Sequence, residues 1–328
     1  MAGHLAILDV GHGNAAVLKT DDWVAVIDAG PGGSLVQYLI EQGITRIDEV
    51  LISHADEDHL AGLVGVLSSG QFSLGRVRLN SDAVKESKIW MDLAVALDDA
   101  ARQGAIDFRP SLTESDSGQF DHGAVSIEVI APTNFLAQRG PGSTDRSGRR
   151  VTTNSISAVI RVAINGQRLA LFAGDVDEIG LDELAHVGRT DLGAPILVFP
   201  HHGGRAGTGD PGAFAARLSQ MVQPTCVVFS IGRGIHGTPI PAVVEAIRRH
   251  GANTRIACTQ LSEHCAAMTP NLAPTHLHAA FARGREKRQC CAGTLVVDFQ
   301  SPDTLLPATA SHVTFIHAHA PTSLCQRN

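Results

Sequence analysis

One short stretch of the chain crowds histidines and acidic residues together. In residues 51–62, LISHADEDHLAG, these are His54, Asp56, Asp58 and His59, with Glu57 between them. Imidazole nitrogens and carboxylate oxygens are ligands of Zn²⁺, Mn²⁺ and Fe²⁺, and two overlapping ligand sets favour two ions over one. A solvated acidic turn that caps a helix is the alternative, because Asp is common at helix starts. The interleaved histidines disfavour that alternative, so we predict half of a metal site.

Two later segments carry side chains that could complete this site. LALFAGD ends an apolar run on Asp175, and PILVFPHHGG ends another on His201 and His202. Taken singly, Asp175 could be a turn residue and the two histidines surface residues. Loops at the ends of strands are where functional residues gather. Because all three motifs follow apolar runs, we expect them to meet at one edge of a sheet.

The combination of motifs resembles the metallo-β-lactamase superfamily, and within it the hydrolase domain of ComEC-type competence proteins. The matching segments are DVGHGN (9–14), HADEDHLAG (54–62), NSIS (154–157), GD (174–175), HHGG (201–204) and GTPIP (237–241). They fall within roughly residues 5–260. The resemblance implies a four-layer αββα sandwich and hydrolysis at two divalent metal ions, Zn²⁺ or Mn²⁺.

Carried over position by position, the resemblance assigns a role to each candidate side chain. The implied metal ligands are His54 and Asp56 on the first ion, Asp58 and His59 on the second, Asp175 bridging both, and His201 as the late ligand. His202 would then face the substrate. Asp28, in VIDAG, matches an Asp that supports the metal-binding turn from behind.

The sequence departs from the superfamily pattern in one important place. The histidine that usually precedes the strand leading to Asp175 is missing, and Asn154 and Ser155 occupy that region, as they would in the ComEC branch. A weaker oxygen ligand or a water could replace it. Three other positions also depart from that branch: His12 replaces Gln, Asn14 replaces Asp, and Thr238 replaces His. His236, two residues before Thr238, either compensates for the missing histidine or is a plain loop histidine.

The expected chemistry follows from two neighbouring cations. They would lower the pKa of a shared water toward neutrality and stabilise negative charge on the attacked group. We expect Asp58 to orient the resulting hydroxide, and His202 or His236 to donate a proton to the leaving oxygen. Such a site suits a phosphodiester, an ester or an amide.

Short apolar runs and helical patterns must position these residues. Runs rich in Val, Ile and Leu, such as WVAVIDAG, DEVLIS and VSIEVIAP, predict buried strands, and patterns that close on glycine, such as HLAGLVGVLSSG, predict helices. Strands in pairs and triplets favour a layered α/β sandwich over a doubly wound sheet. We expect a hydrolase domain at 1–260, with a loop insertion at about 81–150, and a C-terminal lobe and tail at 261–328 with a last strand at 294–299.

Several cysteines gather toward the C-terminal lobe. Cys258, Cys265, Cys290 and Cys291 could converge on one structural zinc ion and stabilise a lobe that is poor in core residues. Their spacing is not that of a C-x-x-C ribbon, so unlinked reduced cysteines are the alternative. Cys226 is expected in the core.

Composition limits the class of protein. Of the 328 residues, 44% are hydrophobic and 18% charged, which indicates a globular protein. The net charge of −7 gives no general attraction to nucleic acid. Two local groups of cations could contact phosphates or could be solvated charge runs: Arg139, Arg146, Arg149 and Arg150, and residues 283–288. No basic leader and no apolar stretch of about 20 residues is present, so we expect a cytoplasmic protein without membrane contact.

These observations lead to an expected function. We predict a soluble metal-dependent hydrolase, a phosphodiesterase or nuclease acting on single-stranded DNA or a nucleotide. One tyrosine and two tryptophans leave few base-stacking platforms, which favours small nucleotides. The alternatives are a lactone, thioester or β-lactam hydrolase on the same fold, or a non-catalytic metal-binding regulatory module. The sequence does not identify a protein partner.

Overall fold

Two β-sheets form the centre of the structure, a computed structural model that describes residues 2–271 and 274–326. The first sheet has eight strands in the order β14-β13-β1-β2-β3-β4-β5-β6. Their bounds are β1 Gly3–Ile7, β2 Ala15–Thr20, β3 Val24–Ala29, β4 Arg46–Ile52, β5 Ser73–Leu79, β6 Asp107–Arg109, β13 Leu295–Asp298 and β14 Leu305–Leu306. Strands β1 to β3 pair antiparallel, and β3 to β6 pair parallel.

The second sheet has six strands in the order β12-β11-β10-β9-β8-β7. Their bounds are β7 Val125–Ala131, β8 Val159–Ile164, β9 Gln167–Phe172, β10 Ile196–Val198, β11 Cys226–Phe229 and β12 Arg255–Cys258. Strands β7 to β9 pair antiparallel, and β9 to β12 pair parallel. Each sheet therefore combines hairpins with β-α-β crossovers.

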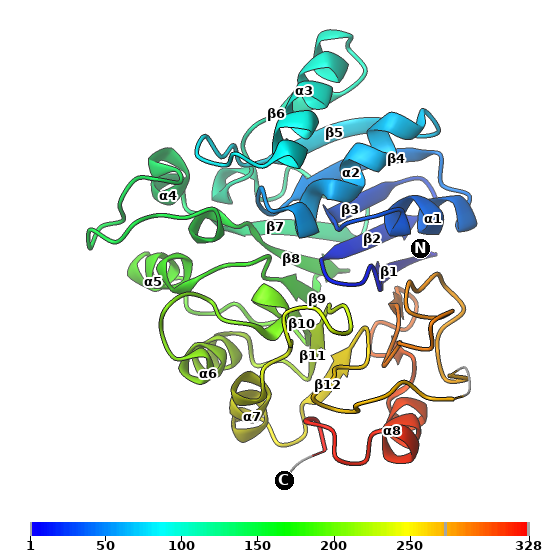
Figure 1. Cartoon of the computed structure of the whole chain (residues 1–328). Coiled ribbons are helices and arrows are strands. Elements are labelled where there is room, and N and C mark those ends of the chain that lie inside the picture. Colours follow the sequence, from blue (N-terminus) through cyan, green and yellow to red (C-terminus); the bar gives the residue numbers. More distant parts are fainter. Residues whose placement is uncertain (1, 272–273, 327–328) are drawn as a thin grey trace.

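Helices cover the outer face of each sheet (Figure 1). Those on the first sheet are α1 Ser34–Glu41, α2 Glu57–Ser69 and α3 Lys88–Arg102, and those on the second are α5 Glu178–His186, α6 Pro211–Val222, α7 Pro241–His250 and α8 Thr309–His319. A short helix, α4 Asn134–Arg139, and three 3₁₀ turns, η1 Glu114–Asp116, η2 Asn154–Ile156 and η3 Pro200–Gly203, lie in the connections. The helix-sheet-sheet-helix order confirms the predicted αββα sandwich.

Three apolar layers hold the sandwich together. The inner layer joins facing residues of the two sheets, such as Ile27 of β3 and Val162 of β8. The outer layers join α2, through Leu63, to the first sheet, and α6, through Leu218, to the second. Every residue of β3 is buried, because one face meets the inner layer and the other meets helices. Each such Leu or Ile side chain contributes roughly 1.5–3 kcal/mol by leaving water.

The structure adds elements that the sequence patterns did not show. Strands β2, β6, β12 and β14 and helices α4, α5, α6 and α8 were not predicted. The expected strand at 294–299 is β13, which pairs antiparallel with β1, and β14 follows it. Among the described residues between 261 and 293, none lies in a helix or a sheet strand. Within the described ranges, no helix is both long and apolar enough to cross a membrane.

The arginine-rich segment after α4 differs from the free cationic loop that we considered. An isolated bridge joins Thr144 and Arg150 across its turn. Arg146 contacts Glu183 at 3.0 Å, and Arg149 contacts Asp182 at 2.7 Å. Because acidic residues of α5 neutralise these guanidinium groups, the segment is a poor candidate for binding phosphates.

Candidate metal centre

A buried carboxylate at the end of β3 fixes the predicted metal-binding turn. Asp28 accepts hydrogen bonds from the Ser53 backbone N–H at 2.7 Å and from the Ser53 hydroxyl at 3.0 Å. Its Oδ2 also lies 2.8 Å from His59 Nδ1. Because a carboxylate only accepts, Nδ1 of His59 carries a proton, and Nε2 is the atom that faces Asp175, 3.4 Å from its Oδ1.

The first histidine of the turn is oriented by two hydroxyl groups. His54 Nδ1 lies 3.0 Å from Ser53 Oγ and 3.2 Å from Ser157 Oγ. Its Nε2 lies 3.5 Å from Asp56 Oδ2. The Nε2 atoms of His54 and His59 are both buried and form no hydrogen bond with any described residue. Buried polar atoms without partners are rare in proteins, so these two nitrogens fit a bound cation.

Asp175 follows β9 and completes the first group of ligand atoms. Its backbone N–H donates to Ser157 Oγ at 2.9 Å, and its Oδ1 accepts from the His201 backbone N–H at 2.8 Å. The preceding Gly174 has φ of 52°, and a Cβ there would lie 2.3 Å from Ser157 Oγ. Glycine is therefore required for this close approach. Donor atoms of His54, His59 and Asp175 all lie within 4.8 Å of one another.

A second group lies beside the first. His202 Nε2 is 2.9 Å and His12 Nε2 is 3.6 Å from Asp58 Oδ2, and these three side chains also have donor atoms within 4.8 Å of one another. Asp58 Oδ2 lies 4.0 Å from His59 Nε2, so the two groups adjoin. Among the described residues, these two groups are the only sets of three or more His, Cys, Asp or Glu side chains with this spacing.

The paired histidines after β10 point in different directions. Both adopt left-handed backbone conformations, with φ of 52° for His201 and 53° for His202. His202 is buried and its ring lies among the second group. His201 Nδ1 lies 3.4 Å from Asp175 Oδ2, while its Nε2 faces the Val176 carbonyl oxygen at 3.2 Å. We expected His201 as the late ligand and His202 facing the substrate. This geometry instead favours His202 as the late ligand.

Charge inside the site is balanced by its own imidazoles. Burial lowers the pKa of His59, but Asp175, Asp28 and Asp58 outweigh it and hold that pKa well above its usual value. Burial raises the pKa of Asp175, but His201 and His59 reverse the effect and hold it well below its usual value. The charged form of His59 thus supplies the positive charge that a metal would bring. Metal binding must displace the proton on its Nε2.

The remaining predicted residues lie at the margins of the site. Asp56 forms an ion pair with Lys85, a residue that we did not predict. Asn154 Oδ1 is buried without a hydrogen-bond partner among the described residues, and Ser155 Oγ donates to Asp177 at 2.7 Å, away from the ligand groups. His236 is exposed, and its ring lies 4.7 Å from that of His12.

Sequence reasoning missed three residues that contact the ligand groups. Ser53 and Ser157 orient the histidines, and His12 joins the second group. Two of the three had a signal: His12 departs from the ComEC pattern within DVGHGN, and Ser157 closes the NSIS segment. A serine carries no metal-binding signature of its own, so only the structure reveals its role.

The four cysteines of the predicted zinc site do not converge. Cys290 Sγ donates to Asp9 Oδ2 at 3.3 Å, whereas Cys291 Sγ lies 3.2 Å from His312 Nε2. Cys258, Cys265 and Cys291 line one small apolar cavity together with Cys325. Since no three of these sulfurs are close enough to share an ion, the structure gives no support to the predicted zinc site.

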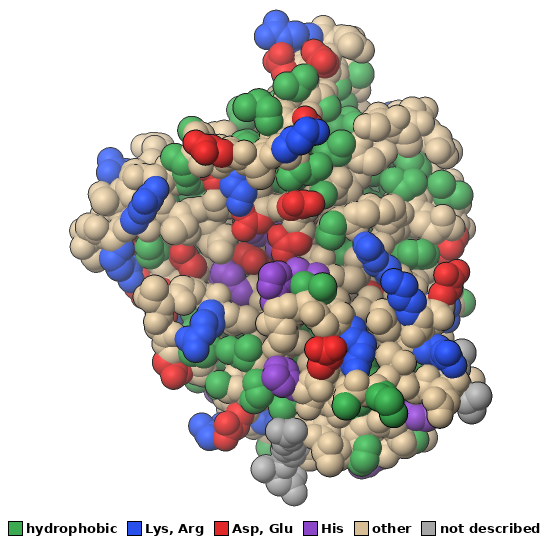
Figure 2. Space-filling model, in the orientation of Figure 1, with side chains coloured by type: hydrophobic (Ala, Val, Ile, Leu, Met, Phe, Trp, Pro, Cys, Tyr) green, Lys and Arg blue, Asp and Glu red, His purple; other side chains and the backbone are tan. Residues whose placement is uncertain are grey.

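Two residues of the second group, His12 and Asp58, line an open pocket of about 660 Å³. Figure 2 shows acidic and histidine side chains gathered at the centre of this face of the molecule. The pocket's acidic and histidine lining residues are His12, Asp56, Glu57, Asp58 and His236. The same pocket is lined by Arg233, Arg283 and Lys287, which we call the basic wall, and by Gln260 and Gln289. The pocket therefore joins part of the candidate metal centre to a basic wall.

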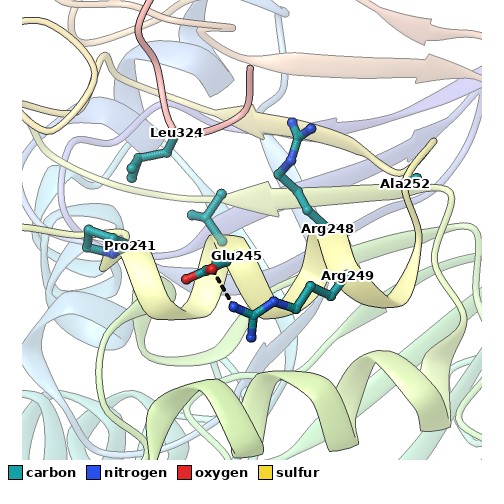
Figure 3. Close-up of a pocket in the computed structure, with 7 residues that line it drawn as sticks. Pro241, Glu245, Arg248, Arg249, Ala252 and Leu324 are labelled. Atoms are coloured by element: carbon teal, nitrogen blue, oxygen red, sulfur yellow. Dashed lines mark hydrogen bonds and ion pairs between the residues drawn. The ribbon is translucent and has the colours of Figure 1, made fainter. Parts of the chain in front are cut away.

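A second hollow of about 620 Å³ lies beside α7 (Figure 3). Arg249 forms an ion pair with Glu245 there, and Arg248 donates to the Cys325 carbonyl oxygen. No residue that lines this hollow belongs to either ligand group. It is thus separate from the candidate metal centre.

Comparison with known proteins agrees with the geometry. A family model described as "Metallo-beta-lactamase superfamily" matches residues 8–216. The chain is 24% identical over 254 residues to "Competence protein ComA" of Neisseria gonorrhoeae, covering 75% of this chain and 30% of that protein. It is 23% identical over 217 residues to "ComE operon protein 3" of Bacillus subtilis (strain 168), covering 66% of this chain and 24% of that protein.

Among solved structures, the chain is similar to the metallo-beta-lactamase fold protein YhfI from Bacillus subtilis. The TM-score is 0.49 at 8% identity, and the match covers 78% of this chain and 96% of YhfI. The chain spans less than a third of the length of the two competence proteins. The family model matches more than half of the chain and includes every residue of the two ligand groups. The protein therefore belongs to the metallo-beta-lactamase superfamily, a superfamily of metal-dependent hydrolases.

Proposed function

We propose that this protein is a phosphodiesterase or nuclease that works with two divalent metal ions. The observation that carries the proposal is the pair of adjoining ligand groups, His54, His59 and Asp175 beside His12, Asp58 and His202. His12 and Asp58 of the second group line an open pocket. Two ions held side by side are suited to a phosphodiester, because one can stabilise the attacking oxygen and the other the leaving oxygen.

In this proposal His202, rather than His201, is the late ligand. Its Nε2 is hydrogen-bonded to Asp58, whereas His201 is turned toward a backbone carbonyl. Asp56 offers a weaker ligand than the turn motif suggested, because Lys85 binds its Oδ1 and leaves only Oδ2 beside His54. Burial raises the pKa of Asp56, but His54 and Lys85 outweigh it and lower that pKa to about 2. Asp56 is thus ionised and able to bind a cation at neutral pH.

Bound divalent cations would supply the positive charge that activates water and stabilises the developing negative charge on phosphorus oxygens. The residues of this chain would hold the ions and orient their ligands. Asp28 fixes the ring of His59, and Ser157 fixes both His54 and the backbone of Asp175. His236 is exposed at the pocket rim, where it can donate a proton to the leaving oxygen.

The substrate class rests on the basic wall of the pocket and on the resemblance to the ComEC-type hydrolase domain, which implies single-stranded DNA. Neutral lactones and β-lactams would gain little from a wall of Arg and Lys side chains. Aromatic residues are 4% of the chain, so stacking on several successive bases is not favoured. A short strand or a nucleotide fits both observations.

The test is metal content by mass spectrometry, followed by hydrolysis of a bis-aryl phosphodiester, an aryl ester and single-stranded DNA. We expect two ions per chain and cleavage of the phosphodiester, both reduced by Asp58→Ala. Asp92→Ala is the matched control, because Asp92 is an acidic residue exposed on α3. A preference for the aryl ester would favour a lactone or thioester hydrolase. Tight metal binding without any cleavage would favour a regulatory module.

A further inference from the structure

Part of the basic wall of the pocket comes from the C-terminal lobe. Arg283, Lys287 and Gln289 belong to a loop that no helix or strand includes, and Arg233 follows β11. This loop lies more than 200 residues after the metal-binding turn in the sequence, yet lines the same pocket. The lobe is therefore part of the site.

A buried carboxylate holds this loop in place. Asp9 is fully buried, and its Oδ2 accepts hydrogen bonds from Gly284 N–H at 2.8 Å and Cys290 Sγ at 3.3 Å. Its Oδ1 accepts from Gln260 Nε2 at 2.9 Å and from Gly11 N–H at 3.1 Å. The turn that carries His12 and the loop of the C-terminal lobe thus share one anchor. This arrangement fixes the basic wall relative to the metal centre.

The cations of the wall have no acidic partners. Arg283 Nη1 donates to the carbonyl oxygens of Val10 at 3.1 Å and Pro31 at 3.0 Å. The guanidinium group of Arg233 also donates only to backbone carbonyls, and Lys287 is exposed. Among the described residues, none of the three forms an ion pair, in contrast to Arg146 and Arg149. Three uncompensated cations beside a pocket attract an anion.

We propose that Arg233, Arg283 and Lys287 form a subsite for a second phosphate, one unit along the strand from the phosphate that is cleaved. The inference rests on the proposed function and makes it more specific. Figure 2 shows basic side chains beside the central acidic and histidine patch, on the side of the C-terminal lobe. A neutral or singly charged diester would leave this wall unused. The preferred substrate is thus an oligonucleotide with at least two phosphates.

The test compares hydrolysis of three thymidine dinucleotides by the metal-loaded protein: one without a terminal phosphate, one with a 5′-phosphate and one with a 3′-phosphate. We expect one terminal phosphate to raise kcat/KM about tenfold, as a charged hydrogen bond does. Lys287→Gln should reduce this ratio toward one. Arg288→Gln is the matched control and should keep the ratio, because Arg288 is exposed on the same loop but does not line the pocket.

Equal rates for the three dinucleotides, a ratio unchanged by Lys287→Gln, or an equal loss of the ratio in both variants would overturn the subsite. If no dinucleotide is cleaved, the phosphodiesterase proposal fails instead. The subsite is then measured as binding of uncleavable methylphosphonate dinucleotides by calorimetry. Tighter binding of a phosphorylated analogue that depends on Lys287 supports the subsite, and equal affinity for all the analogues refutes it.

Discussion

Substituting Asp28 by asparagine changes one atom behind the metal centre and should weaken metal binding. Asn retains the volume of Asp and one acceptor oxygen, which can still serve the Ser53 N–H. Its NH₂ group then faces the Ser53 hydroxyl and His59 Nδ1, which contact Oδ2 of Asp28 at 3.0 and 2.8 Å. To accept from that NH₂, His59 must move its proton to Nε2, the atom that a cation needs. We expect affinity to fall about 10- to 100-fold, or roughly 1.4–2.8 kcal/mol.

The assay is competitive titration of the metal-free protein with Zn²⁺ or Mn²⁺ against a chromogenic chelator. Asp22→Asn is the control, since Asp22 is an exposed residue between β2 and β3, far along the strand from the turn. Thermal unfolding of the metal-free variant shows whether the fold survives. If Asp28→Asn folds and binds metal as tightly as the control, the orienting role of Asp28 is wrong.

Three further predictions concern the same site. His202→Gln should remove one bound ion or lower the affinity for it about tenfold or more, while His201→Gln should have a smaller effect. The measurement is metal stoichiometry, and the reverse order would restore His201 as the ligand. Ser157→Ala leaves buried polar groups unpaired, so it should lower the free energy of unfolding by about 1–3 kcal/mol and reduce metal affinity more than Ser155→Ala does. The pKa of His59 is raised in the folded protein, so its charged form stabilises the metal-free fold. This stabilisation is complete below pH 6.5, the ordinary pKa of histidine, and is lost as pH rises through the pKa of the folded state. The Tm of the metal-free protein should therefore fall above pH 6.5, a fall that His59→Gln should lessen and that bound metal should remove.

Local spacing in the sequence predicted the acidic turn, and apolar patterns favoured a layered α/β sandwich, while the resemblance to the superfamily implied the αββα order. His54, Asp56, Asp58 and His59 lie within one strand-to-helix connection, where adjacent residues must be adjacent in space. Strands β9 and β10, which pair parallel in the second sheet, then bring Asp175 and the paired histidines together, beside the turn that follows β4 of the first sheet. These parts of the site depend on elements whose apolar patterns are strong.

Other parts depend on contacts that no local pattern encodes. The choice between His201 and His202 is made by two successive left-handed residues, which decide which ring turns inward. The predicted zinc site has no support, because Cys290 and Cys291 turn in different directions, toward Asp9 and His312. Neighbouring residues of an extended chain point to opposite sides, so adjacent cysteines need not face one ion. Spacing in the sequence encodes neither the backbone conformation of the histidines nor the contacts of the cysteines.

Backbone strain is concentrated where the ligands are. Among the described residues, seven that are not glycine have positive φ, and four of them lie at the site: Asp28, His201, His202 and His236. Each such conformation costs of order 1–3 kcal/mol and persists only where the surroundings enforce it. At Asp28 they do so through the two Ser53 bonds, and at His201 through its N–H bond to Asp175. The strain thus lies in residues around the acidic turn: Asp28 supports it from behind, and His202 places its ring beside Asp58. A merely solvated acidic turn would not need strained neighbours of this kind, so the geometry favours a metal centre over a surface loop.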